Sequence, residues 1–160
     1  MLTRRRFLKR AGGAAALLAG AAVFGPACGT EGPDRDAPPT LRYGEERCAY
    51  CTMSIDDARF AAAWRTPSGG ERHFDDIGCM VNAYRREAPA SDSRFWVHDY
   101  RSQEWQDAGA ATYLTSPSFK TPMGYGVAAF ASAADAATAV PAAKTMLAWA
   151  ELLTAVERKG

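Results

Sequence analysis

The chain lacks the sequence patterns of several common functional classes. It has one C-x-x-C pair, at Cys48 and Cys51, and no second pair that would complete a four-cysteine zinc site. It contains no phosphate-binding loop, no G-x-G-x-x-G segment and no Ser/His/Asp order typical of a hydrolase. Nothing in these patterns requires an enzyme, and we therefore expect a protein that is not catalytic.

Basic charge is scarce outside the N-terminus. Five of the 19 basic residues lie in the first 28 positions, so the remaining 14 face 18 acidic residues and give a net charge of about −4. Nucleic-acid binding depends on basic patches that neutralise phosphates. We therefore exclude nucleic acid as a partner.

Long hydrophobic runs are absent as well. The apolar segment at residues 11–24 is too short and too rich in alanine and glycine to span a membrane. It follows a basic segment in which residues 3–9 (TRRRFLK) match the twin-arginine export pattern S/T-R-R-x-F-L-K. We predict that residues 1–28 are an export signal and that the rest of the chain works at the extracytoplasmic, periplasmic face of the cell envelope.

The end of this signal resembles that of a lipoprotein. Cys28 follows a small residue, Ala27, as the lipid-modified cysteine of a lipoprotein does. We predict that a lipid on Cys28 anchors the chain to the membrane, with cleavage by an ordinary signal peptidase as the alternative. Residues 29–40 hold three prolines and no large apolar residue, so we expect a flexible tether. Residues 41–160 are then one domain.

Sulfur, in contrast, is concentrated in the segment 48–53 (CAYCTM). Cys48, Cys51 and Met53 lie on a short polar stretch, and thiolates and thioethers together are the ligands that select a soft ion such as Cu(I). Met123 stands in a second turn-forming segment, 121–124 (TPMG), instead of on an apolar stripe. We predict that the two segments meet and that their four sulfurs bind copper.

Two further residues are candidates for the same site. The domain has three cysteines, an odd number that a purely structural disulfide framework would not use. Cys79 falls off the apolar stripe of its predicted helix and near the helix start, which suits a ligand or a reactive thiol, although burial of a small residue explains it equally well. His98 lies in an aromatic strand, where a half-buried histidine is the default, but it could complete a Cys/Met/His site.

The residue patterns predict an α+β domain. Turn residues 66–70 (TPSGG) indicate a hairpin, and Asp75 and Asp76 are expected to cap a helix. The order of elements suggests an approximate internal duplication. The predicted elements are a hairpin over 59–65 and 71–74, helices over 76–87, 132–138 and 142–158, and strands at 94–100, within 105–114 and at 126–130.

Several of these segments together resemble the NosL family, the lipoproteins that accompany nitrous oxide reductase maturation. The resemblance covers about residues 43–137. The segments that carry it are 48–53 (CAYCTM), 59–64, 74–80 (FDDIGCM), 97–100 (VHDY), 105–108 (WQDA) and 121–130, which opens with TPMG.

The resemblance implies a small fold of two related ββαβ modules, akin to the organomercurial lyase fold, here followed by a C-terminal helix. It also implies an accessory protein that binds Cu(I) and delivers it for assembly of a copper enzyme such as nitrous oxide reductase. By position the ligands would be Cys51, Met53 and Met123, with Cys48 and His98 as further candidates. Thr52 departs from the family, which usually has glycine before the methionine, and a β-branched residue restricts the backbone there.

Two other functions remain open at this point. Cys48 and Cys51 could act as an extracytoplasmic thiol–disulfide pair, although the residues around them do not resemble the strand and helix of a thioredoxin motif. A carbon–mercury lyase would need two cysteines and an acid around one metal. Cys48 or Cys51 with Cys79 and Asp75 could supply them only if their segments meet.

Overall fold

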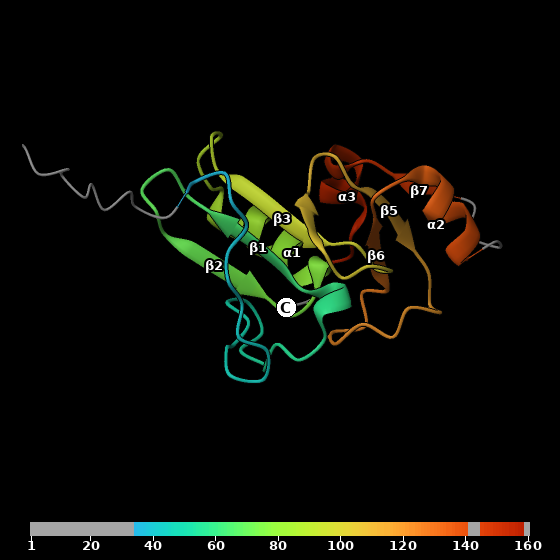
Figure 1. The fold of residues 1–160 in the computed structure, drawn as a ribbon, viewed down its shortest axis with the longest axis horizontal. Coiled ribbons are helices and arrows are strands. Elements are labelled where there is room, and N and C mark those ends of the chain that lie inside the picture. The colour runs from blue at the N-terminus through green and yellow to red at the C-terminus, as the bar shows by residue number, and fades with distance from the viewer. Residues whose placement is uncertain (1–33, 141–144, 159–160) are drawn as a thin grey trace, which may run out of the picture. The chain divides into compact units, whose positions relative to one another are not determined.

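The structure, a computed structural model, describes residues 34–140 and 145–158. The predicted export signal and the lipid site at Cys28 lie outside the described residues. The α+β prediction is confirmed, because two antiparallel sheets carry helices that follow their hairpins (Figure 1). None of the helices in the described part of the chain is long and apolar enough to cross a membrane.

The first module contains a hairpin, a helix and two further strands. The strand order in its sheet is β2-β1-β3-β4, and every neighbouring pair is antiparallel. A short 3-10 helix, Ala58–Phe60, replaces the start of the predicted first strand. The elements are β1 (Ala62–Arg65), β2 (Glu71–Phe74), α1 (Ile77–Glu87), β3 (Arg94–His98) and β4 (Trp105–Asp107).

The second module repeats this order on a smaller scale. Its sheet has the order β6-β5-β7, which matches β2-β1-β3, and α2 follows the hairpin as α1 does. The expected pair of ββαβ modules is therefore present in the topology. The elements are β5 (Thr112–Thr115), β6 (Val127–Phe130), α2 (Ala133–Ala139), β7 (Met146–Leu147) and α3 (Trp149–Ala155).

Helix α1 is the element that positions the site. It begins after Asp76, whose side chain accepts a hydrogen bond from the Gly78 backbone N–H, and it ends at Ala88 in the left-handed region. All residues from 77 to 83 are buried, because α1 contacts β1 and β2 of the first sheet as well as β6 and α3 of the second module. Cys79 is therefore buried although it lies off the predicted apolar stripe.

The predicted C-terminal helix over 142–158 is wrong in its extent. Within the described residues, α3 covers only Trp149–Ala155, and Met146 lies in β7 opposite Leu114. Residues 146 and 147 follow a helical pattern, but they form a strand because they pair with β5. The helix starts only after Ala148, whose N–H donates a hydrogen bond to the Glu151 carboxylate. Met146 is 38% exposed.

The second half of the predicted tether packs on the first sheet. The buried Arg65 side chain donates to the backbone oxygens of Asp34, at 2.6 Å, and Ala37, at 3.0 Å, while it pairs with Glu71. Pro39 is buried. Residues 34–40 therefore lie against the domain instead of extending away from it.

Asp99 joins the two modules. It follows β3, its Oδ1 accepts the Ala131 N–H at 2.9 Å, and its Oδ2 accepts the N–H groups of Arg101, at 3.1 Å, and Ser102, at 2.8 Å. Burial alone would raise the pKa of this carboxyl, but the hydrogen bonds from Ser102 and Ala131 lower it below its usual value. The ionised form is therefore the one that the fold stabilises.

We expect Asp99→Asn to lower the free energy of unfolding by about 1–3 kcal/mol at pH 7, because hydrogen bonds to a charged acceptor become weaker or mismatched. A carboxyl with a lowered pKa stabilises the fold fully above about pH 4, its unfolded value, and loses this contribution as the pH falls through the folded pKa. Urea unfolding at pH 7 and pH 3 measures the difference. Asp92→Asn, at an exposed position, is the control, and an equal loss at both pH values would contradict the assignment.

Candidate metal site

Cys48 and Cys51 lie on a tight turn that several hydrogen bonds hold in place. The Cys48 N–H donates to the Met53 oxygen at 2.8 Å, and the Thr52 N–H donates to the Cys48 oxygen at 3.0 Å. The Ala49 N–H donates to the His73 oxygen at 2.8 Å, which attaches the turn to the end of β2. The two thiols are thus brought to the point where the chain leaves β2 for α1.

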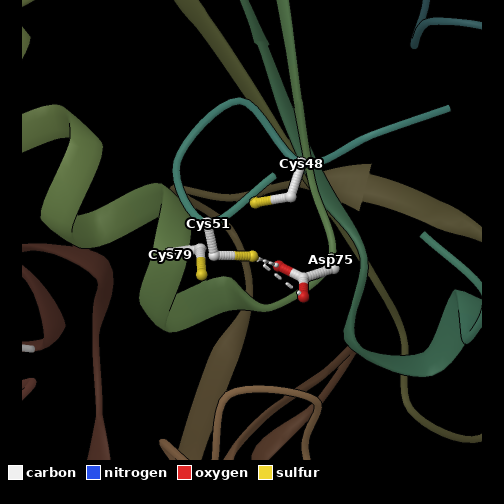
Figure 2. Close-up of side chains that lie close together, drawn as sticks. All are labelled: Cys48, Cys51, Asp75 and Cys79. Atoms are coloured by element: carbon white, nitrogen blue, oxygen red, sulfur yellow. Dashed lines mark hydrogen bonds between the residues drawn. The ribbon is translucent and has the colours of Figure 1, made fainter. Parts of the chain in front are cut away.

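Asp75 and Cys79 come from the other side of this junction. Asp75 directly follows β2, and Cys79 lies in the first turn of α1, two residues after Ile77. Figure 2 shows the side chains of Cys48, Cys51, Cys79 and Asp75 close together, with the Cys51 sulfur directed at the Asp75 carboxylate. Their ligand atoms all lie within 4.8 Å of one another. We call these four side chains the thiol cluster.

The three cysteines of the cluster are free thiols. The Cys51 Sγ donates to both Asp75 carboxylate oxygens, at 3.3 Å each, and the Tyr50 N–H donates to the Cys48 Sγ at 3.5 Å. Cys48 is 2% exposed and Cys79 is fully buried, whereas Cys51 is half-buried. The cluster therefore opens toward the surface at Cys51.

The protonation of the three thiols differs. The hydrogen bond from Cys79 lowers the pKa of Cys48 to about 7, so that Cys48 carries thiolate character near neutral pH. Burial raises the pKa of Cys51 to about 12. The hydrogen bond to Cys48, followed by burial, also raises the pKa of Cys79. A soft cation would replace these protons, because metal binding requires deprotonated thiols.

The segment that carries Met123 contacts the start of α1. The Met123 N–H donates to Asp76 Oδ2 at 3.1 Å, and the same carboxylate, whose pKa burial raises, accepts from Thr121. Tyr125 lies against Gly78 so closely that a Cβ on Gly78 would lie 2.2 Å from its Cγ. Met123 itself is half-buried and packs against the core cluster that contains Cys48 and Cys79. Both sulfur-bearing segments therefore reach the same helix start.

Met53 and His98 are placed differently from the thiols. Met53 follows the turn and is 46% exposed. His98 is buried, with one ring nitrogen 2.6 Å from the Tyr43 hydroxyl and the other 2.7 Å from the Gln103 oxygen, and its ring stacks on Trp105. Burial lowers its pKa. Its two nitrogens are engaged within the fold, and it does not join the thiol cluster.

Asp75 is the site residue whose role the sequence did not reveal. We expected Asp75 and Asp76 to serve as helix caps, yet only Asp76 caps α1, while Asp75 is buried and accepts from Cys51. The sequence signal for a site role of Asp75 was its position between the end of a predicted strand and the cap residue Asp76. A side chain there points toward the segment that packs across the junction.

Thr52 lies at a strained backbone position on the turn. Its φ is +66°, in the left-handed region that is unfavourable for residues with a Cβ. The departure from glycine noted in the sequence thus falls where the turn requires a positive φ. The hydrogen bonds of this residue use its backbone N–H and oxygen, which glycine would retain.

We expect Thr52→Gly to stabilise the fold by about 0.5–1 kcal/mol, because relief of the left-handed strain exceeds the added flexibility of the unfolded chain. The midpoint of thermal unfolding measures this gain. Thr40→Gly is the matched control at an exposed residue that does not have a positive φ, and it is expected to lose stability. A decrease of equal size in both variants would show that Thr52 is not strained.

Fold and site together define a small α+β protein of two related modules, with a thiol cluster where β2 meets α1 in the first module. The sequence pattern of the NosL family matches residues 40–146, and the chain belongs to this family. Among solved structures, the copper chaperone NosL from Shewanella denitrificans is similar in fold, with a TM-score of 0.58 and 16% sequence identity over 71% of this chain and 96% of that one. A search of curated proteins finds no match.

Proposed function

We propose that this chain is a Cu(I)-binding chaperone that delivers copper for the maturation of a periplasmic copper enzyme such as nitrous oxide reductase. The observation that carries the proposal is the thiol cluster, in which three free thiols converge within 4.8 Å beside a methionine-bearing segment. Membership of the NosL family and the fold of a protein described as a copper chaperone support the same function.

The donor set favours Cu(I) over harder ions. Thiolates and thioethers bind soft ions, and the proposed ligands are Cys51, Met53 and Met123, with Cys48 joining them. A structural zinc site would close around the ion with four Cys or His ligands. Here Cys51 is half-buried and Met53 is exposed, which leaves an ion within reach of an acceptor protein. An open site suits a cargo that has to leave.

Transfer of copper to the acceptor would take place outside the cytoplasm. Residues 1–28 would direct export, a lipid on Cys28 would hold the protein at the membrane, and residues 29–40 would join that anchor to the domain. The partner is then a copper apo-enzyme or a copper-transfer protein in the same compartment. Exposed Glu45 and Asp56 lie near the 48–52 turn in sequence and would favour a partner with a basic surface.

The geometry argues against a thiol–disulfide enzyme that uses Cys48 and Cys51. Such enzymes expose a thiol of lowered pKa at a helix N-terminus. In this chain the more exposed thiol, Cys51, has its pKa raised to about 12, and Cys48, whose pKa is lowered, is 2% exposed. Both lie on a turn, and the next helical element, the short 3-10 helix Ala58–Phe60, begins seven residues after Cys51.

One observation favours a second candidate, the cleavage of carbon–mercury bonds. Two thiols and a carboxylate do converge, since Cys79 and Asp75 meet the 48–51 turn. The Asp75 carboxylate accepts hydrogen bonds from the Cys51 thiol, but the chain belongs to the NosL family and shares the fold of a protein described as a copper chaperone. We expect no methane when the protein is incubated with methylmercury, and methane release in proportion to enzyme would establish this activity.

Competition for Cu(I) with bicinchoninate tests the proposed function. The reduced full chain is expected to withdraw one equivalent of Cu(I) from the chelator, and Cys51→Ala/Met123→Ala is expected to lose this ability. Met146→Leu, a methionine in β7 of the second sheet, is the control and should bind as the unmodified chain does. Unchanged affinity in the double variant would contradict the proposal.

A further inference from the structure

We propose that Cys48 and Cys79 form an inner copper position, and that Cys51 is a ligand shared between this position and an outer one made with Met53 and Met123. The inference rests on the proposed function, because it assumes that the cargo is Cu(I). It adds a resting place for the ion and a path by which the ion reaches the surface.

Burial separates the candidate ligands into two sets. Cys48 is 2% exposed and Cys79 is fully buried, while Met53 is 46% exposed and Met123 is half-buried. Cys51 is intermediate in exposure and is the member of the cluster nearest in sequence to Met53. An ion bound by Cys48 and Cys79 would be shielded from solvent, and one bound by the two methionines would not.

The inner set is already close to a binding geometry. A metal–thiolate bond of about 2.3 Å in a trigonal arrangement separates the sulfurs by about 4.0 Å. The ligand atoms of the thiol cluster lie within 4.8 Å of one another, so small side-chain rotations suffice. The turn that carries Cys48 and Cys51 is fixed by hydrogen bonds to itself and to β2, and Cys79 is held by the buried start of α1.

Charge also favours a cation at the inner position. The Cys48 Sγ accepts a hydrogen bond from the Tyr50 N–H at 3.5 Å, and such a donor stabilises a thiolate. Three thiolates, from Cys48, Cys51 and Cys79, around one Cu(I) leave a net charge of −2. Cys79 lies in the first turn of α1, where the helix dipole stabilises an anion. The Asp75 carboxylate accepts hydrogen bonds from the Cys51 thiol when Cys51 is not bound to metal.

Movement of copper outward is a sequence of ligand replacements without redox change. The bond from Cu(I) to the Cys51 sulfur is kept, the bonds to Cys48 and Cys79 break, and bonds to the thioethers of Met53 and Met123 form. Each released thiolate takes up a proton from solvent, and copper remains Cu(I) throughout. Thioethers carry no charge and bind more weakly than thiolates, so the outer position is suited to release.

X-ray absorption at the copper edge distinguishes the two positions without a mutation in the site. The full chain, produced with selenomethionine and loaded with one equivalent of Cu(I), is expected to show sulfur and no selenium in the first shell of copper. Selenium in that shell would overturn the inner position and leave the proposed function intact. Failure to bind Cu(I) at all would overturn both.

The kinetics of release provide a second, independent test. Met53→Leu/Met123→Leu is expected to keep its Cu(I) affinity within about 3-fold and to release copper to bicinchoninate at least 10-fold more slowly, because the exit ligands are lost. Cys48→Ser is expected to release copper at least 10-fold faster, and circular dichroism verifies its fold. If the methionine variant instead loses most of its affinity while Cys48→Ser behaves as the unmodified chain, the inner position does not exist.

Discussion

Replacement of Cys51 by serine is expected to weaken Cu(I) binding by about 100-fold or more, which corresponds to about 2.8 kcal/mol. Loss of a group that only supports a metal ligand costs about 10–100-fold in affinity, so loss of a ligand should reach the top of that range. The effect should exceed that of replacing any other single ligand, because both proposed copper positions include Cys51.

Serine is the informative substitution at this position. Its hydroxyl can keep the hydrogen bond that the Cys51 thiol donates to Asp75, so the turn is expected to retain its structure. A hard oxygen is nevertheless a poor ligand for Cu(I). Competition with bicinchoninate measures the loss, and unchanged unfolding in urea verifies the fold. An affinity within 3-fold of the unmodified chain would mean that Cys51 does not bind the ion.

Gly78→Ala is expected to produce the largest loss of stability, about 3 kcal/mol. A Cβ at this position would lie 2.2 Å from Tyr125 Cγ and 2.4 Å from its Cδ2, so the ring has to move. Tyr125 is buried, and it belongs to the segment that places Met123 on Asp76. The higher helix propensity of alanine offsets only about 1 kcal/mol of the cost.

Two further variants give this prediction its control. Gly109→Ala brings a Cβ to 3.0 Å from only the Asp107 Oδ1, an exposed side chain that can shift, and we expect it to cost less than about 1 kcal/mol. Tyr125→Ala combined with Gly78→Ala should cost less than the sum of the two single changes, because the clash is removed. If urea unfolding places Gly78→Ala within 1 kcal/mol of the unmodified chain, the close contact is not a constraint.

The elements that the sequence predicted well are those with local causes. The hairpin of β1 and β2 follows from the turn residues 66–70, and α1 follows from the cap at Asp76 and its apolar stripe. The C-terminal helix failed in its first part, because Met146 and Leu147 pair with β5, a strand more than thirty residues earlier. Helical periodicity alone could not reveal that long-range partner.

The same distinction applies to the site. The sequence predicted Cys48, Cys51 and Met53 as metal ligands because their sulfurs lie together on one polar segment, which is a local feature. The roles of Asp75 and Cys79 depend on contact between the 48–51 turn and the β2–α1 junction, across more than twenty residues. Sequence could identify both residues as candidates, but only the fold brings them within reach of the turn.

Anomalous diffraction at the copper edge, from crystals of the chain loaded with one equivalent of Cu(I), shows whether the thiol cluster binds copper. We expect a single copper peak at the thiol cluster, within bonding distance of the Cys51 sulfur. A peak bound elsewhere in the chain, or a loaded chain whose cluster holds no copper, would contradict it.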